Sequence, residues 1–184
     1  GDHRDLHLSL RRQRQMCIRD SFFTNAIHKK FAIYMNSIKE AQVDKRLFLG
    51  YPKVSCDPRT IFAVLNSVLT YLGMELIGRT NLGEGALDVN VVDYEKIPII
   101  DPIWLENKLK SENKLDEFFS VVDKLLGLKP VNIEKEVSRN VRIEMEKYVL
   151  GAIGFTVNDI FSLYRSLIEL VKFRTERAAS LRTT

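Results

Sequence analysis

A long amphipathic helix is predicted by the stretch DPRTIFAVLNSVLTYLGMELIG, which covers residues 57–78. Asp57 is a favourable N-cap residue, and Pro58 occupies the first helical position, where its missing N–H group costs nothing. Gly78 is typical of the residue that ends a helix. The apolar residues that recur every three or four positions, and so form one face, are Ile61, Leu65, Leu69, Leu72 and Leu76. We therefore expect one central helix that runs to about residue 77.

Short strands are predicted on both sides of this helix, because apolar and polar residues alternate there. The expected strands cover residues 28–35, 46–51 and 86–92. Residues 93–96 are expected to form a turn, and residues 97–102 an extended segment that contains two prolines.

Beyond residue 102 the spacing of the apolar residues predicts helices only. The expected helices cover residues 103–110, 115–126 and 133–149, and a last helix begins near residue 156. Thr156 and Asp159 have the spacing of a capping box at its start. The sequence thus predicts an α+β fold, in which a short-stranded region with one central helix (22–101) is followed by an all-α C-terminal region (102–184).

The composition excludes some classes of protein. The chain has 184 residues, a net charge of +4 and a hydrophobic fraction of 45%, which is typical of a folded protein rather than a disordered one. No apolar run reaches the roughly 18 residues that a membrane span needs, so we expect no membrane partner. Two cysteines cannot form a disulfide framework, which favours a cytoplasmic location. The small positive charge permits nucleic-acid binding without arguing for it.

Residues 1–20 differ in character from the rest of the chain. They hold five arginines and three aspartates and show neither helical nor strand periodicity. The segment RRQRQMCIRDS at 11–21 resembles a peptide obtained by translating sequencing-adapter DNA. We interpret residues 1–21 as a disordered, non-native arm in front of a piece of a longer gene. The alternative is a basic N-terminal arm that contacts nucleic acid.

Few residues indicate catalytic chemistry. Gly83 and Gly85 mark the glycine-rich loop, but this loop follows a helix and leads into a strand, unlike a dinucleotide-binding loop. Cys56 precedes a helix, where a thiolate is favoured, yet no base or orienting acid accompanies it. We predict no catalytic residue and no metal site. The carboxylates that we interpret as a solvated sheet edge, rather than as metal ligands, are Asp88, Asp93, Glu95 and Asp101.

Several residues are candidates for DNA binding. Arg79 is followed by Thr80 and Asn81 in the glycine-rich loop, where such residues suit contacts with phosphates or base edges. The alternative is that Arg79 pairs locally with Glu75 or Glu84. The other candidates are Lys29, Lys30, Arg46 and Lys53. We expect them to flank a phosphate-binding face, and the alternative is that they are charges that keep the edges of the sheet soluble.

Two blocks of sequence resemble a known family. The first consists of LNSVLTYL (65–72), LIGRTNLGEGAL (76–87) and VDYEKIP (92–98). It resembles the end of the DNA target-recognition domain in adenine-specific (N6) DNA methyltransferases of restriction–modification systems. The second consists of VLGAIGF (149–155) and YRSLIELVKFR (164–174), and it resembles the C-terminal helical tail of the large single-chain enzymes of this group. That tail usually reads leucine-glycine-leucine where this chain has Ile153, Gly154 and Phe155.

The resemblance covers residues 22 to about 182 and implies a role in recognising double-stranded DNA. Members of the family transfer the methyl group with an Asp/Asn-Pro-Pro-Tyr/Phe motif that holds a flipped adenine. This chain has no Pro-Pro pair. We therefore expect the S-adenosylmethionine site and the catalytic motif in a missing N-terminal methyltransferase domain, on which the helical tail docks. The chain alone is expected to bind no cofactor and to neither methylate nor cleave DNA.

Under this interpretation the basic candidates named above contact the DNA backbone, and Asn81 contacts a base edge or a phosphate. The asparagine-serine helix also occurs in specificity subunits of type I restriction–modification systems, so a DNA-binding specificity subunit is one alternative. A second alternative is an α+β interaction module that is unrelated to DNA.

Overall fold

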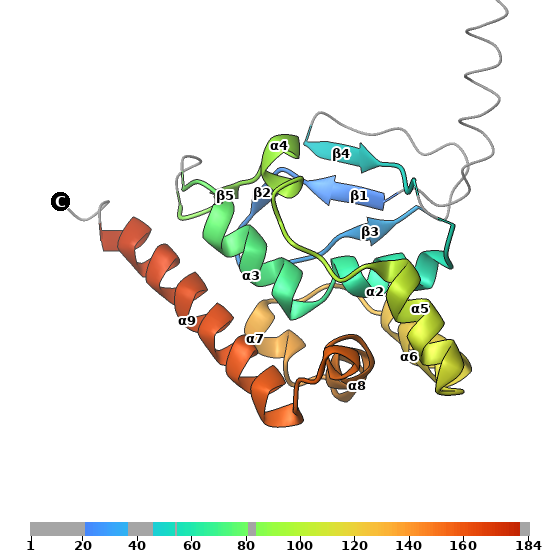
Figure 1. Cartoon of the computed structure of the whole chain (residues 1–184). Helices are drawn as coiled ribbons and strands as arrows, with labels where there is room; N and C mark the ends of the chain where they lie inside the picture. The colour runs from blue at the N-terminus through green and yellow to red at the C-terminus, as the bar shows by residue number, and fades with distance from the viewer. Residues whose placement is uncertain (1–20, 37–45, 54, 81–83, 181–184) are drawn as a thin grey trace, which may run out of the picture.

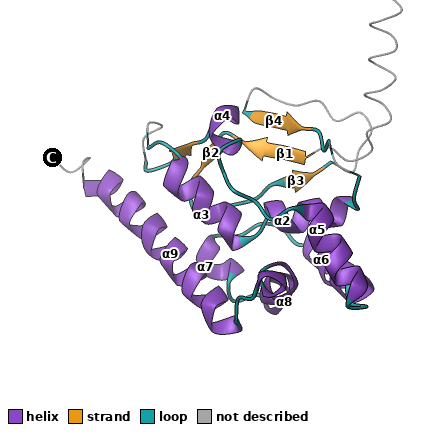
Figure 2. Cartoon of the chain, in the orientation of Figure 1, coloured by secondary structure: helices purple, strands orange, loops and turns teal. Residues whose placement is uncertain are grey.

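The computed structural model describes residues 21–36, 46–53, 55–80 and 84–180. Within them, two small antiparallel sheets lie on one side of the molecule and most helices lie on the other (Figures 1 and 2). The three-stranded sheet has the order β3-β1-β4 and the two-stranded sheet the order β2-β5. The strands are β1 (Ser21–Thr24), β2 (Ala26–Ile27), β3 (Tyr34–Met35), β4 (Leu47–Gly50) and β5 (Leu87–Asp88).

The first expected strand is only partly correct. Of residues 28–35, only Tyr34–Met35 forms a strand. Ile33 pairs instead with a side chain, because its N–H donates to Asn66 Oδ1 (3.0 Å) and its carbonyl accepts from Asn66 Nδ2 (2.9 Å). The centre of the sheet is β1, which precedes the expected strands and includes Ser21, a residue expected in the N-terminal arm. The expected strand at 46–51 is confirmed as β4.

The central helix is two helices rather than one. α2 (Pro58–Leu65) and α3 (Val68–Ile77) meet at Asn66 and Ser67, with an angle of 50° between them. The predicted start of α2 is confirmed, because the Asp57 side chain accepts a hydrogen bond from the Arg59 N–H. The bend was not predicted, because the apolar spacing continues through it.

Residues 91–94 correct the expected third strand. Only Leu87–Asp88 is a strand, and α4 (Val91–Tyr94) follows where we expected strand and turn. Asn90 and Asp93 form a capping box at the start of α4, in which the Asn90 N–H donates to Asp93 Oδ2 (3.0 Å). This local hydrogen bonding stabilises a helical turn in spite of the β-branched valines.

The C-terminal region is helical, as predicted. The capping box at its last helix is confirmed, because the Thr156 N–H donates to Asp159 Oδ2 (2.8 Å) and the Asp159 N–H to Thr156 Oγ1 (3.2 Å). The expected helix at 133–149 is divided in two. The helices are α5 (Pro102–Ser111), α6 (Leu115–Leu126), α7 (Ile133–Glu136), α8 (Asn140–Val149), the 3-10 turn η1 (Gly151–Ile153) and α9 (Val157–Ser180).

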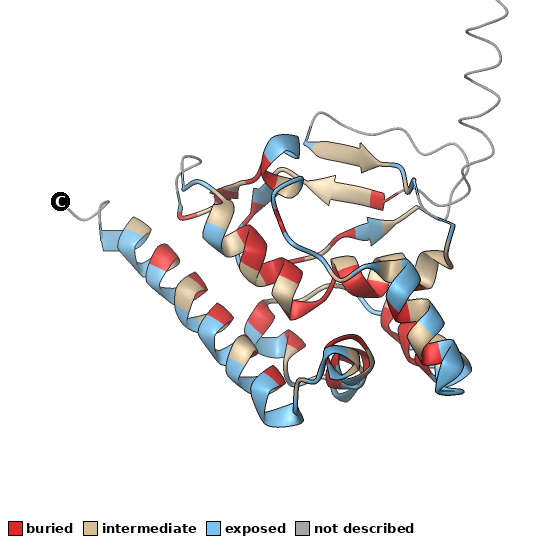
Figure 3. Cartoon of the chain, in the orientation of Figure 1, coloured by how far each residue is buried: buried red, intermediate tan, exposed pale blue. Residues whose placement is uncertain are grey.

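One hydrophobic core joins side chains from before and after residue 101, where we expected a domain boundary. Met74 of α3, Phe118 of α6 and Tyr164 of α9 are all 0% exposed members of it. Figure 3 shows that the buried residues of α9 lie on its side toward α3, while its outer side is exposed. The boundary itself stays a prediction. None of the described helices is by itself long and apolar enough to cross a membrane.

Polar side chains of α8 hold the junction between α2 and α3. Glu146 is 0% exposed and accepts hydrogen bonds from Ser67 Oγ (2.9 Å) and the Val68 N–H (2.7 Å). Its carboxylate therefore caps α3 from another helix. The Tyr164 hydroxyl also donates to Glu146 (2.9 Å). Burial raises the pKa of Glu146, while these donors and Arg142 act in the opposite direction.

Arg142 secures the same junction one helical turn away. It donates to the Asn66 carbonyl (2.8 Å) and to the Tyr71 hydroxyl (2.7 Å), and it is 3% exposed. Burial raises the pKa of Tyr71 to about 12, so this hydroxyl stays neutral. Among the described residues Arg142 Nε and Glu136 Oε2 have no hydrogen-bond partner, and these two atoms lie 3.6 Å apart. These groups compensate each other's burial and fix the bend.

We predict that Glu146→Ala destabilises the protein by about 3 kcal/mol or more, because three buried donors, Ser67 Oγ, the Val68 N–H and the Tyr164 hydroxyl, lose their acceptor. Denaturant unfolding followed by circular dichroism measures this loss as a lower midpoint. Glu144→Ala is the matched control, because Glu144 is exposed on the same helix. Its effect should stay within about 0.5 kcal/mol. Equal midpoints for the two variants would contradict the capping role.

Candidate nucleic-acid interface

Arg79, one of the predicted DNA-binding residues, is held by an acidic side chain of α4. Its Nη2 lies 2.7 Å from Asp93 Oδ2, and the side chain of Arg79 is 49% exposed while that of Asp93 is 11% exposed. The Asn90 N–H and then the guanidinium of Arg79 lower the pKa of Asp93, so this carboxylate remains charged. The ion pair of Arg79 is formed with Asp93, a partner that we did not expect, and Glu75 pairs with Arg174 instead.

The helix α4 is fixed to the end of the sheet. The Tyr94 hydroxyl donates to the Thr24 carbonyl (2.7 Å), and the Tyr94 ring packs edge-on against Phe23, with ring centroids 5.0 Å apart. The backbone at Arg79 is fixed as well, because its N–H and carbonyl both bond to Asp88 (3.0 and 2.7 Å). The guanidinium of Arg79 is therefore held beside α4, which Figure 1 shows at the upper edge of the molecule.

Two further basic residues lie near α4. The Arg46 carbonyl accepts from the Asn25 N–H (3.2 Å), and Asn25 in turn bonds to Val89 just before α4 (2.9 Å). Lys96 is exposed, and its charge contributes to the lowered pKa of Asp93. Exposed apolar side chains lie on α4 itself, where Val91 is 47% and Val92 is 59% exposed. We call the surface formed by Arg46, Arg79, Val91, Val92 and Lys96 the α4 surface.

The remaining basic candidates lie elsewhere. Lys29 and Lys30 line a different groove, of about 380 Å³, together with Tyr34 and Asn132. Lys53 follows the far end of β4 from Arg46, and this four-residue strand alone spans on the order of 13 Å. Asn81 lies outside the described residues. The structure thus brings Arg46 and Arg79 to one corner but does not gather all the candidates on one face.

Sequence reasoning missed Asp93 as the partner of Arg79, and it missed Lys96. The capping spacing of Asn90 and Asp93 is a signal that predicts a helical turn here. The interpretation of Asp93 as a residue on a solvated edge is wrong, because it is 8% exposed and bonded to Arg79. Asp101 caps α5 by accepting from the Ile103 N–H (2.8 Å). In the ranges that the structure describes, no three His, Cys, Asp or Glu residues are arranged to hold a metal ion.

The glycine-rich loop is fastened to α9 at its end. Arg174 forms a bidentate ion pair with Glu75 (2.7 and 3.0 Å) and donates to the carbonyls of His28 (2.7 Å) and Gly85. Gly85 has a φ of +68°, and a Cβ there would lie 2.9 Å from the Arg174 carbonyl. His28 Nε2 also lies 2.9 Å from the Glu84 carbonyl. A protein side chain thus occupies the place beside Gly85, which agrees with a structural loop rather than a phosphate-binding one.

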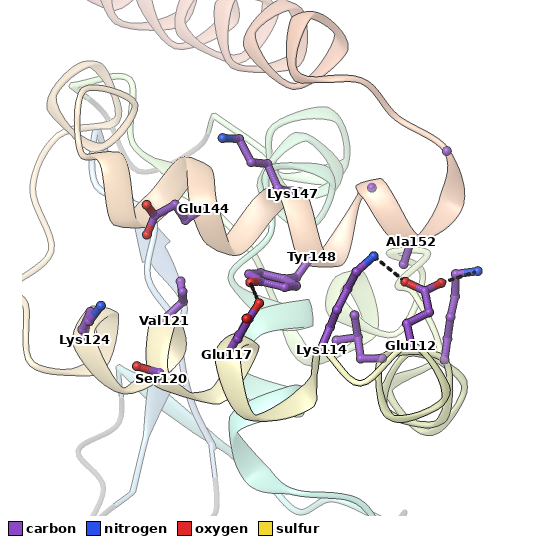
Figure 4. A pocket seen from close by; sticks show the side chains of 14 residues that line it. Glu112, Lys114, Glu117, Ser120, Val121, Lys124, Glu144, Lys147, Tyr148 and Ala152 are labelled. Atoms are coloured by element: carbon purple, nitrogen blue, oxygen red, sulfur yellow. Dashed lines mark hydrogen bonds and ion pairs between the residues drawn. The ribbon is translucent and has the colours of Figure 1, made fainter.

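A groove of about 1020 Å³ lies between α5, α6 and α8 (Figure 4). Glu112 pairs with Lys108 (3.3 Å) and with Lys114 (2.7 Å), and the Tyr148 hydroxyl donates to Glu117 (3.1 Å). The other charged residues that line it are Lys124, Glu144 and Lys147. Charges of both signs alternate along this groove, so it has no strong preference for an anion or a cation.

Cys56 is not an activated nucleophile. Burial and the nearby carboxylates, Glu106 first, raise the pKa of its thiol to about 11. The expected benefit from the start of α2 is outweighed, because Glu106 also bonds to the Asp57 N–H (2.7 Å) at that start. The thiol therefore stays protonated near neutral pH.

Comparison with known proteins adds no relative: no family model, curated protein or solved structure matches this chain.

We predict that Cys56 reacts slowly with iodoacetamide. At pH 8 a thiol with a pKa near 8.5 is about one quarter thiolate, while one with a pKa near 11 is about 0.1% thiolate, so alkylation slows roughly 200-fold. The Cys17→Ser variant leaves Cys56 as the sole thiol, and mass spectrometry follows its modification against free cysteine. The rate should rise steadily as the pH approaches 11. A rate near that of free cysteine at pH 8 would contradict the raised pKa.

Proposed function

We propose that this chain is the DNA-recognition and C-terminal portion of an adenine-N6 DNA methyltransferase of a restriction–modification system, and that the α4 surface contacts duplex DNA. The observation that carries the proposal is the half-exposed side chain of Arg79, whose guanidinium is held beside α4 by the largely buried carboxylate of Asp93. Exposed, oriented arginines beside other basic residues are typical of proteins that bind phosphates and base edges.

The packing of the two blocks that resemble the methyltransferases supports the same proposal. Ser67, in the first block, and Tyr164, in the second, both donate to the buried carboxylate of Glu146. Gly85, in the first block, accepts from Arg174, in the second. The segments on which the resemblance rests therefore belong to one structural unit, as expected if they derive from one enzyme.

The proposed role is recognition rather than methyl transfer. The Asp/Asn-Pro-Pro-Tyr/Phe motif is absent from the sequence, and Cys56 is not activated. In the proposal, S-adenosylmethionine and the flipped adenine are held by a methyltransferase domain of the same protein, and the helical region after residue 102 docks on that domain.

We predict duplex binding that weakens steeply with salt, because phosphate contacts release counterions. Fluorescence anisotropy of a labelled duplex between 50 and 200 mM salt measures the slope of log affinity against log salt. Arg46→Ala and Lys96→Ala should each reduce that slope by about 1. Their matched control is Lys124→Ala, which removes the same charge from the groove in Figure 4 instead of the α4 surface.

Two results would contradict this proposal. Absence of salt-dependent binding would favour an interaction module unrelated to DNA. An equal loss for Lys124→Ala and for the two α4-surface variants would mean that the overall charge, and not the α4 surface, attracts the duplex.

A further inference from the structure

We propose that Arg79 determines sequence specificity by binding the major-groove edge of a guanine, and that Asp93 is the positioning residue that orients it. This inference rests on the proposed function, since it names what the α4 surface recognises. It goes beyond general attraction to DNA, because it assigns one side chain to one type of base.

The geometry of the ion pair leaves the guanidinium able to bind a second group. Arg79 Nη2 donates one hydrogen bond to Asp93 Oδ2 (2.7 Å). An arginine side chain carries five N–H donors in total. In the described ranges Arg79 forms its side-chain contact with Asp93, and the side chain of Arg79 is 49% exposed. A half-exposed guanidinium that gives one hydrogen bond at Nη2 can present a second edge to a ligand. That edge has the geometry to donate two hydrogen bonds to guanine O6 and N7.

The support behind the guanidinium is rigid. Asp93 is held by the Asn90 N–H (3.0 Å), and the next residue, Tyr94, is tied to β1 through Thr24 (2.7 Å). The backbone of Arg79 is bridged to Asp88. An arginine fixed at both its backbone and its guanidinium loses little further conformational entropy on binding, so its directional contacts contribute more to discrimination.

The charge distribution favours base recognition over simple phosphate binding. A surface that binds only phosphates is expected to be uniformly basic, but the exposed Glu95 precedes Lys96 in the chain, and Asp93 neutralises part of the charge of Arg79. Asp93 both caps α4 and, through the same Oδ2 atom, orients the guanidinium of Arg79. The exposed side chains of Val91 and Val92, next to Asp93 in the chain, offer apolar contacts of the kind that thymine methyl groups make in the same groove.

Selection of duplexes from a randomised pool, with the full chain as bait, tests this inference. We expect the selected site to contain a G·C pair whose replacement weakens binding by about 5- to 150-fold, the range of a good bidentate contact. Arg79→Lys should lose discrimination at that one position and keep it elsewhere, because lysine retains the charge but lacks the planar fork. Arg79 is exposed, so this variant should fold like the wild type.

Asp93→Asn provides the second variant, and its thermal unfolding is measured alongside to confirm that it folds. Discrimination at the same G·C pair should fall although Arg79 is still present. Lys96→Ala is the control, because it should weaken binding to all duplexes by a similar factor.

The outcomes separate this inference from the proposed function. If Arg79→Lys keeps every base preference, Arg79 does not bind a base edge and the inference is overturned. Salt-dependent binding of the wild type without any selected site also overturns it, but leaves DNA binding by the α4 surface intact. Absence of all binding overturns both.

Discussion

The carboxylate of Glu146 at the start of α3 is the contact on which the rest of the structure depends. One helix ends and the next begins at this point, since α2 stops at Leu65 and α3 starts at Val68. The buried Val68 N–H has no partner within its own helix, and such a group is costly unless another part of the chain supplies an acceptor. By supplying it, α8 sets the angle between α2 and α3 and makes the C-terminal helices part of the core.

The same junction reaches the sheet through Asn66. Its side chain bonds to both backbone groups of Ile33 and therefore takes the place of a strand partner just before β3. Arg142 donates to the backbone carbonyl of Asn66, and the Tyr71 hydroxyl donates to the side-chain oxygen of Asn66. Both the backbone and the side chain of Asn66 are therefore fixed. A network of this kind is stable only when nearly all of its members are paired, which requires α2, α3 and α8 to form together.

A second buried ion pair fixes the opposite end of α3. Arg174 and Glu75 are each about 5% exposed or less at their side chains, and Arg174 also bonds to the chain beside β2 and to the end of the glycine-rich loop. With α3 held at both ends, the corner at α4 rests on a rigid support. In the role that we propose for Arg79, this rigidity favours recognition, because a mobile guanidinium would lose more conformational entropy on binding.

The sequence alone determined the fold class, the helical character of the C-terminal region and the caps at Asp57 and Thr156, because these depend on local periodicity and on side chains a few residues apart. Tertiary structure decided where helices bend, that Ile33 pairs with an amide rather than a strand, and that Arg79 binds Asp93. Each of these depends on hydrogen bonds between residues 14 or more positions apart. Apolar spacing reports which face of a segment is buried, but it carries no information about which distant polar group satisfies the backbone there.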